Sequence, residues 1–209
     1  METLQAGKQR VNGTDIRTIA QVGILGGIAF LLMTIEIPLW FAPGFYRLDL
    51  SELPVLIGAF AMGPLAGVLI ELVKVVLYFF IHGSSTAGVG DMANFIMGCA
   101  LVVPAAALYK NHKTKKRAVA GLVSGTVAMA AASSLLNAFL LLPLYAAAFH
   151  MPLAQIVQMG TQVNPAITNL FTFVLFAVVP FNLFKGVVVS VLTMLLYKKV
   201  SPILHGKLH

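Results

Sequence analysis

Charged side chains are scarce in this chain. Of its 209 residues, 10% are charged and 59% are hydrophobic, whereas a soluble domain carries roughly a quarter charged residues. A helix that crosses a bilayer needs about 20 mostly apolar residues, and its backbone amides must be hydrogen-bonded within the segment. The composition therefore predicts several membrane-spanning helices, and five stretches carry no charge at all: 18–35, 53–70, 92–109, 118–149 and 151–184.

The chain also lacks the residue patterns of several enzyme classes. Its single cysteine, Cys99, excludes a disulfide framework. The sequence contains no GxxxxGK[ST] phosphate loop and no HExxH zinc motif. The five histidines are scattered over loops and tails. We therefore expect a protein that is not an enzyme, hydrolyses no ATP itself, and holds neither a cofactor nor a metal.

The apolar runs predict an all-α integral membrane protein with six transmembrane helices. No signal peptide is evident, because the first sixteen residues are polar and the apolar run after them is long enough to span. We expect the last helix to be one span, kinked near Pro180, and the segment 143–164 to be a partly re-entrant or surface loop. The six predicted spans are 16–35, 52–62, 65–81, 91–109, 118–142 and 165–197.

The distribution of positive charge predicts the orientation. Six spans place 11 of the 14 lysines and arginines on one side, in the two tails and in the loop 110–117. Cytoplasmic loops carry an excess of Lys and Arg, so both termini are expected in the cytoplasm. The net charge of +7 thus reflects topology rather than nucleic acid binding. We expect a polar tail at 1–15, one transmembrane domain at 16–200 and a second tail at 201–209.

Two pairs of polar residues lie within predicted spans, where ionisable groups are costly. Glu71 and Lys74 are three apart and can pair on one helix face; a role in coupling to a partner is the other interpretation. Asn182 and Lys185 have the same spacing, but no acidic residue lies nearby in sequence to neutralise the lysine. An amide and an ammonium on one face offer hydrogen bonds to a ligand.

Asn137 is a lone amide in the fifth span. It could form a hydrogen bond between helices or bind a ligand, and the sequence leaves both open for Asn137 and for Asn182. Aromatic residues beside sparse polar groups suit a planar heterocycle as well as a packed core. They are Phe139, Tyr145, Phe181 and Phe184.

The first span carries small residues at helical spacing. Gly23 and Gly27 are four apart, and Ala20 precedes them on the same side. Such a face lets another helix approach closely. It predicts packing either within this chain or against a partner.

Several segments resemble the substrate-binding (S) components of energy-coupling factor (ECF) vitamin transporters. The first loop and second helix carry FYRLDLSELP at 45–54, and a later helix carries GDMANFIMG at 90–98. The segment PFNLFKG at 180–186 resembles the last helix of the riboflavin-specific members. The resemblance extends from the first span to Tyr197.

The resemblance implies a six-helix protein of the prokaryotic cell membrane that captures riboflavin from outside with high affinity. It implies docking on a transmembrane scaffold subunit driven by two ATPase subunits. Carried over by position, Asn137, Asn182 and Lys185 would bind the flavin ring. Asp49, with Tyr46 and Leu48, would help to close the pocket. The docking face would be Ala20, Gly23 and Gly27. Flavin mononucleotide, another vitamin, and a scaffold without substrate stay open as alternatives.

Overall fold

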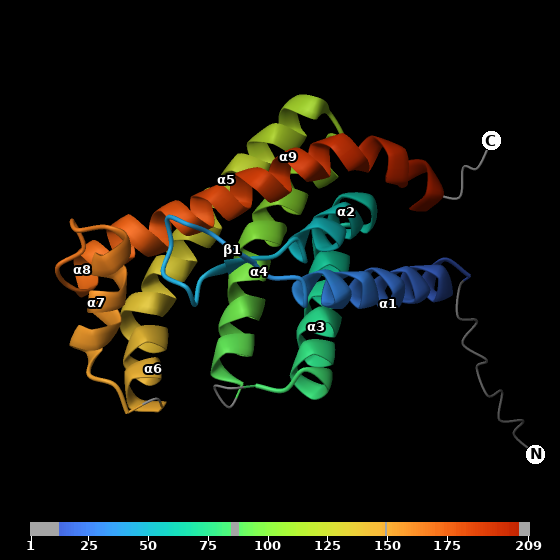
Figure 1. The fold of residues 1–209 in the computed structure, drawn as a ribbon. Coiled ribbons are helices and arrows are strands. Elements are labelled where there is room, and N and C mark those ends of the chain that lie inside the picture. The colour runs from blue at the N-terminus through green and yellow to red at the C-terminus, as the bar shows by residue number, and fades with distance from the viewer. Residues whose placement is uncertain (1–12, 85–87, 149, 205–209) are drawn as a thin grey trace, which may run out of the picture.

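The computed structural model describes residues 13–84, 88–148 and 150–204. Helices dominate it (Figure 1). The two predicted polar tails fall outside the described residues, apart from 13–15 and 201–204 at helix ends. Within the described residues, five helical stretches are long and apolar enough to cross a membrane, and a shorter apolar helix, Glu52–Met62, accompanies them. The long stretches are Ile16–Met33, Pro64–Ile81, Val89–Lys110, Lys115–Ala147 and Leu170–Val200.

The short helix α2 (Glu52–Met62) lies inside the protein. Every residue of α2 from Glu52 to Phe60 is buried. Gly63 separates it from α3 (Pro64–Ile81) and has a φ of 104°, a conformation that favours glycine. Pro64 then occupies the first position of α3, where its missing N–H costs nothing. The Gly63-Pro64 break predicted from sequence is confirmed.

A two-stranded hairpin joins α1 (Gly13–Met33) to α2. Strands β1 (Ile37–Pro38) and β2 (Arg47–Leu48) are antiparallel, with Ile37 opposite Leu48. At their base Arg47 and Glu36 form a largely exposed ion pair of 3.0 Å. In Figure 1 the hairpin crosses the middle of the molecule, between α9 and the ends of α1 and α2. It therefore carries the residues on either side of β2 toward the interior.

The two longest helical stretches each contain a π-helical segment just before a proline. η1 (Asn137–Leu141) joins α5 (Lys115–Leu136) to α6 (Leu142–Ala148), and Pro143 follows it. η2 (Val174–Val178) joins α8 (Leu170–Phe173) to α9 (Val179–Leu204), and Pro180 follows it. Proline has no N–H to donate, and its ring crowds the carbonyl four residues earlier. The wider π turn gives room for the ring and leaves the helix continuous. The irregularity expected near Pro180 thus lies at 174–178, within one continuous helical stretch.

The prediction of a loop over 143–164 was wrong for most of that segment. Helix α6 continues to Ala148, and α7 covers Leu153–Val163. The π turn lets Pro143 remain inside a helix. Helix α7 buries Ile156 and Gly160, and a Cβ at Gly160 would meet the Phe173 ring at 2.7 Å. This close packing holds α7 against α8.

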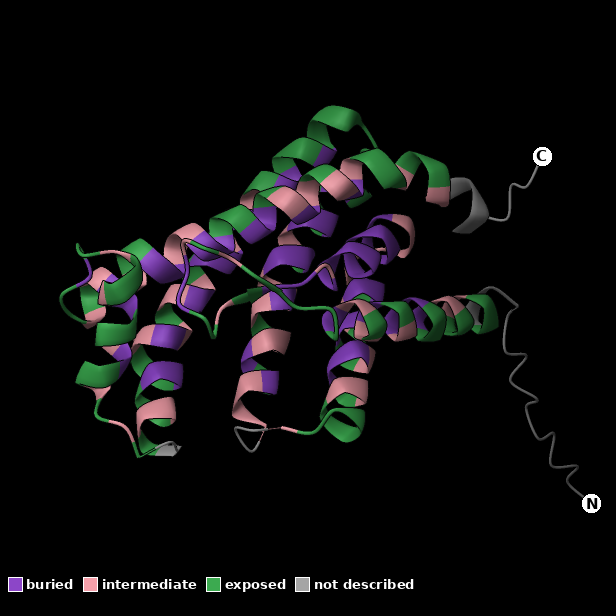
Figure 2. Cartoon of the chain, viewed as in Figure 1, coloured by how far each residue is buried: buried purple, intermediate pink, exposed green. Residues whose placement is uncertain are grey.

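Figure 2 colours the buried residues purple along the chain. The buried hydrophobic residues form two clusters. The larger is built from α1, α2, α3, α4 (Val89–Lys110), α5 and α9, and includes Leu56, Ile70 and Leu101. Glycines bring α4 and α5 into close contact: a Cβ at Gly125 would lie 2.1 Å from the Leu101 carbonyl oxygen. The smaller cluster is built from α6, α7, α8 and η2.

Candidate ligand-binding site

A cavity of about 550 Å³ lies where the two core clusters meet. Ligand pockets of small molecules commonly have this volume. The hairpin, α2, α4, the α5–α6 stretch, α7 and α9 all contribute to its wall. η1 contributes Asn137 and Leu141, and α9 contributes Phe181 shortly after η2. The polar and aromatic lining residues are Phe45, Tyr46, Arg47, Asp49, Glu52, Asn94, Asn137, Tyr145, Phe181, Asn182 and Lys185.

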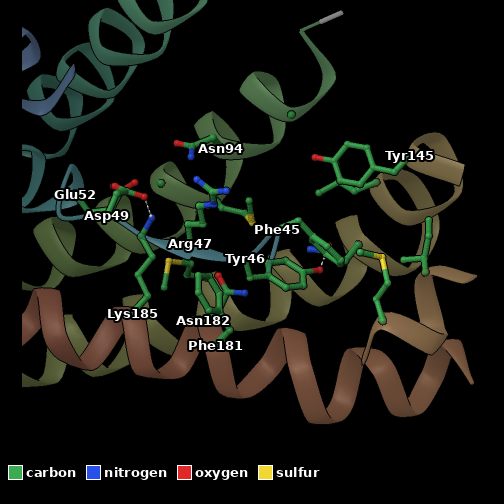
Figure 3. A pocket seen from close by; sticks show the side chains of 18 of the residues that line it. Phe45, Tyr46, Arg47, Asp49, Glu52, Asn94, Tyr145, Phe181, Asn182 and Lys185 are labelled. Atoms are coloured by element: carbon green, nitrogen blue, oxygen red, sulfur yellow. Dashed lines mark hydrogen bonds and ion pairs between the residues drawn. The ribbon is translucent and has the colours of Figure 1, made fainter. Parts of the chain in front are cut away.

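Lys185 is paired with an acid that is remote in sequence. Its Nζ lies 2.8 Å from Oδ2 of Asp49, and both side chains are about nine-tenths buried. Figure 3 shows the pair at one end of the cavity. Oδ1 of Asp49 accepts hydrogen bonds from the backbone N–H and the hydroxyl of Ser51. Burial alone would raise the pKa of Asp49, but Lys185, Lys74 and these hydrogen bonds lower it to about 2.

A second group of buried charges adjoins the first. Lys74 on α3 lies 2.8 Å from Glu52 and 2.5 Å from Glu71, and it also donates to the Ser51 hydroxyl at 3.3 Å. The predicted pair of Glu71 and Lys74 is confirmed, and Glu52 is a third member. Gly98 on α4 makes room for the Glu71 side chain, because a Cβ at position 98 would lie 2.3 Å from the Glu71 carboxylate. The two lysines and three carboxylates therefore form one buried network.

The two predicted asparagines are each partly engaged in hydrogen bonds. Asn137 donates to the Ser133 carbonyl at 2.8 Å, and its Oδ1 accepts from the Tyr46 hydroxyl at 2.6 Å. Asn182 donates to the Val178 carbonyl at 2.9 Å. An asparagine amide carries two donors and a carbonyl with two lone pairs. Each side chain therefore keeps a donor and an acceptor site for a ligand.

Aromatic rings form part of the cavity wall. Tyr46 lies 5.3 Å from Phe181, measured between ring centroids. Phe45 stacks on Phe173 of the smaller core cluster, with centroids 6.2 Å apart and an interplanar angle of 8°. Of the four aromatic residues near the polar positions in sequence, Tyr145 and Phe181 line the cavity, and Phe139 and Phe184 do not. Phe139 is 79% exposed, and Phe184 packs against Phe41 instead.

Most of the predicted ligand residues meet at this cavity. Asn137, Asn182, Lys185, Asp49 and Tyr46 all line it. Leu48 is buried in β2 beside them and does not line the cavity.

Two of the other polar lining residues, which sequence reasoning did not single out, have a buried oxygen without a hydrogen-bond partner among the described residues. These oxygens are Oδ1 of Asn94 on α4 and Oε2 of Glu52. The segment 90–98 that carries Asn94 belonged to the family resemblance, which was the one signal that pointed to it. Unpaired buried polar atoms are costly, so these two oxygens are candidates for contact with a bound molecule.

Comparison with known proteins places the chain in a family. Residues 17–197 match the family model described as "ECF transporter, substrate-specific component". The chain belongs to this family. It is therefore a component of a transporter in the prokaryotic cell membrane, and the family is not one of enzymes.

Relatives of this ECF component carry consistent names. The riboflavin transporter RibU of Staphylococcus aureus is 35% identical, over 93% of this chain and 96% of its own length. The riboflavin transporter FmnP of Bacillus subtilis is 34% identical, over 90% of this chain and 93% of its own length. A solved structure described as the S component of a bacterial ECF transporter matches with a TM-score of 0.70 and 32% identity, over 90% of this chain and 98% of that one.

The small-residue face of this ECF component points outward. Ala20 and Gly23 are exposed, and Gly27 is half-buried. A Cβ at Gly23 or Gly27 would meet no atom within 4 Å, whereas one at Gly26 would meet the Val73 side chain at 2.5 Å. Gly26 is thus the glycine that packs α1 on α3. Gly23 and Gly27 are not needed for packing within the described part of the chain.

Proposed function

We propose that this chain is a high-affinity riboflavin-binding S component that captures the vitamin from outside for ATP-driven uptake. The observation that carries the proposal is a 550 Å³ cavity in which two asparagines and a lysine lie beside aromatic rings. The pyrimidine edge of the flavin ring alternates carbonyl and N–H groups. Amides match both kinds of group, and Lys185 donates to a carbonyl or ring nitrogen. The named relatives support the same ligand.

In this proposal Asn137, Asn182 and Lys185 hold the ring edge, and Tyr46 and Phe181 pack against the ring. Asp49, with Leu48 in the strand behind it, keeps Lys185 oriented and closes one end. A site built for hydrogen bonds rejects ligands that leave its buried groups unpaired. Binding therefore selects the flavin ring over other apolar molecules of similar volume.

Flavin mononucleotide is the nearest alternative, and the charges near the cavity favour the neutral vitamin. Lys185 is already neutralised by Asp49, and Arg47 by Glu36. Glu52 adds a further carboxylate to the wall. A phosphate would have to displace an acid from one of the two cations. We therefore expect weaker binding of the phosphorylated form.

Transport is proposed to require a transmembrane scaffold subunit and two ATPase subunits. This chain has no ATP-binding motif, so the energy must come from partners. The outward face of Ala20, Gly23 and Gly27 on α1 suits a closely packed helix of the scaffold. A scaffold that binds no substrate would not account for a cavity lined by buried polar atoms without hydrogen-bond partners among the described residues.

The topology proposed is six spans with both termini in the cytoplasm. The spans are α1, α2, α3, α4, the α5–α6 stretch and the α8–α9 stretch, with the hairpin and α7 on the outer side. The transmembrane domain covers 16–200, between cytoplasmic tails 1–15 and 201–209. The placement of 11 of 14 basic residues supports this orientation.

The test is a titration of purified full-length protein with riboflavin, followed by quenching of flavin fluorescence. We expect saturable quenching with one flavin per chain, weaker competition by flavin mononucleotide, and none by thiamine. Absence of riboflavin binding to monodisperse protein would overturn the proposal. Tighter binding of flavin mononucleotide would replace the neutral vitamin by its phosphate as the ligand.

A further inference from the structure

A second hollow lies on the side of the protein between α5 and α9. It has a volume of about 1090 Å³ and shares no lining residue with the cavity described above. In Figure 1, α9 crosses α5 near this region. We call this hollow the α5–α9 groove. It is lined mainly by α5 between Lys115 and Val127 and by α9 between Leu183 and Lys198.

The walls of the α5–α9 groove are aliphatic and exposed. On α5, Val123 and Val127 are each 58% exposed, and on α9 Val191 and Leu195 are 53% and 64% exposed. Both helices belong to stretches long and apolar enough to span a bilayer. These side chains therefore face hydrocarbon, and the hollow between them is of a kind that acyl chains fill.

One end of the α5–α9 groove is basic. Lys115 is the first residue of α5, Lys113 lies two residues before it, and Lys198 lies near the end of α9. All three are exposed, none is paired with an acid among the described residues, and no acidic side chain lines the described groove. The first turn of α5 adds the partial positive charge of a helix N-terminus. This end therefore attracts an anion at the level of the lipid headgroups.

We propose that the α5–α9 groove is a binding site for an anionic phospholipid. The phosphodiester lies among Lys113, Lys115 and Lys198, and the acyl chains lie along α5 and α9. Basic pockets between transmembrane helices bind anionic headgroups in this way. A zwitterionic lipid would bring its own cation toward the three lysines, so the site discriminates by charge. A free phosphate would leave the apolar length of the groove empty.

The test uses the full-length protein, stripped of lipid in detergent and then titrated with phosphatidylglycerol or phosphatidylcholine of identical chains. Bound lipid is counted by native mass spectrometry. We expect one phosphatidylglycerol bound in preference to phosphatidylcholine. Each lysine near a headgroup contributes about fivefold in affinity, so Lys113→Gln, Lys115→Gln and Lys198→Gln together should weaken phosphatidylglycerol binding on the order of a hundredfold.

A matched variant controls for overall charge. Lys110→Gln, Lys116→Gln and Lys199→Gln also remove three exposed lysines from the same region, but none of these lines the groove. We expect this control to bind phosphatidylglycerol as the wild type does. An equal loss in both triple variants would show a diffuse charge effect and overturn the proposal.

A second variant tests the apolar part of the groove. Val191→Trp places a large side chain between α5 and α9 and should prevent lipid retention, whereas Leu72→Trp on exposed α3 surface should not. Monodispersity on size exclusion confirms that each variant is folded. No preference between the two lipids in the wild type, unchanged retention in Val191→Trp, or equal competition by glycerol phosphate without acyl chains would each overturn the proposal.

Discussion

Lys185 of α9 and Asp49 of the first loop form an ion pair of 2.8 Å across 136 positions of sequence. Through Ser51, this pair connects with Lys74 on α3. Helix α3 in turn packs against α1 at Gly26 and Val73. A continuous set of buried contacts therefore links the cavity to the helix that carries the proposed docking face.

The first prediction concerns this ion pair. Asp49→Asn and Lys185→Met should each lower riboflavin affinity by about tenfold or more, because the remaining partner is left buried and misoriented. Residues in direct contact couple by roughly 0.5 to 3 kcal/mol, so the double variant should bind no worse than the weaker single variant. Fluorescence titration of all four proteins measures the coupling. As a control, Glu36→Gln removes an acid that lies outside the cavity and should bind riboflavin normally. If the losses in affinity of the two single variants add in the double variant, the coupling is refuted.

The second prediction concerns stability. Lys74→Met leaves Glu52 and Glu71 buried without their cation, and removal of one partner from a buried pair costs roughly 3 to 5 kcal/mol. The exposed pair of Arg47 and Glu36 is worth about 1 kcal/mol at most, so Arg47→Gln is the control. Denaturant unfolding of ligand-free protein in detergent measures the free energy of unfolding of Lys74→Met, Arg47→Gln and the wild type. Equal stability of Lys74→Met and the wild type would contradict the account of the network.

The third prediction separates docking from folding on α1. Gly23→Leu and Gly27→Leu should fold and bind riboflavin normally, since their new side chains meet open space. They should abolish uptake in cells that contain the ATPase subunits, because the scaffold helix can no longer approach. Gly26→Leu, one position away, should instead reduce the yield of folded protein by collision with Val73. Normal uptake by both Gly23→Leu and Gly27→Leu would show that the scaffold docks on another surface.

The fourth prediction concerns topology. In a Cys99→Ala background, Lys199→Cys should react with a membrane-impermeant maleimide only after cells are opened. Gln158→Cys on α7 is exposed and should react in intact cells. Labelling of position 199 from outside would refute six spans with a cytoplasmic C-terminus.

Features that depend on residues close together in the sequence were predicted correctly. The uncharged runs located the helical stretches, and the i, i+3 spacing predicted the pair of Glu71 and Lys74. It could not supply Glu52, the third member, because that carboxylate lies on a different helix. For the same reason Lys185 had no visible partner in sequence, and its partner is Asp49.

Backbone irregularity was the other limit. A loop was predicted from Pro143 onward and a kink near Pro180, but a π turn precedes each proline and both helical stretches continue through it. Phe181, Asn182 and Lys185 share one face of α9 and line the cavity, whereas Phe184 falls outside that face. Phe139, in η1, is exposed.

The most direct test of the central claim is a riboflavin titration of purified Asn137→Leu, Asn182→Leu and Lys185→Met beside the wild type. Asn111→Leu, at the exposed end of α4, is the control. Each lost hydrogen bond to a neutral group costs roughly 1 to 3 kcal/mol, which is about fivefold to more than a hundredfold in affinity. The account predicts losses of this size in the three cavity variants and none in Asn111→Leu. Unchanged affinity in all three would place the ligand outside this cavity and contradict the account.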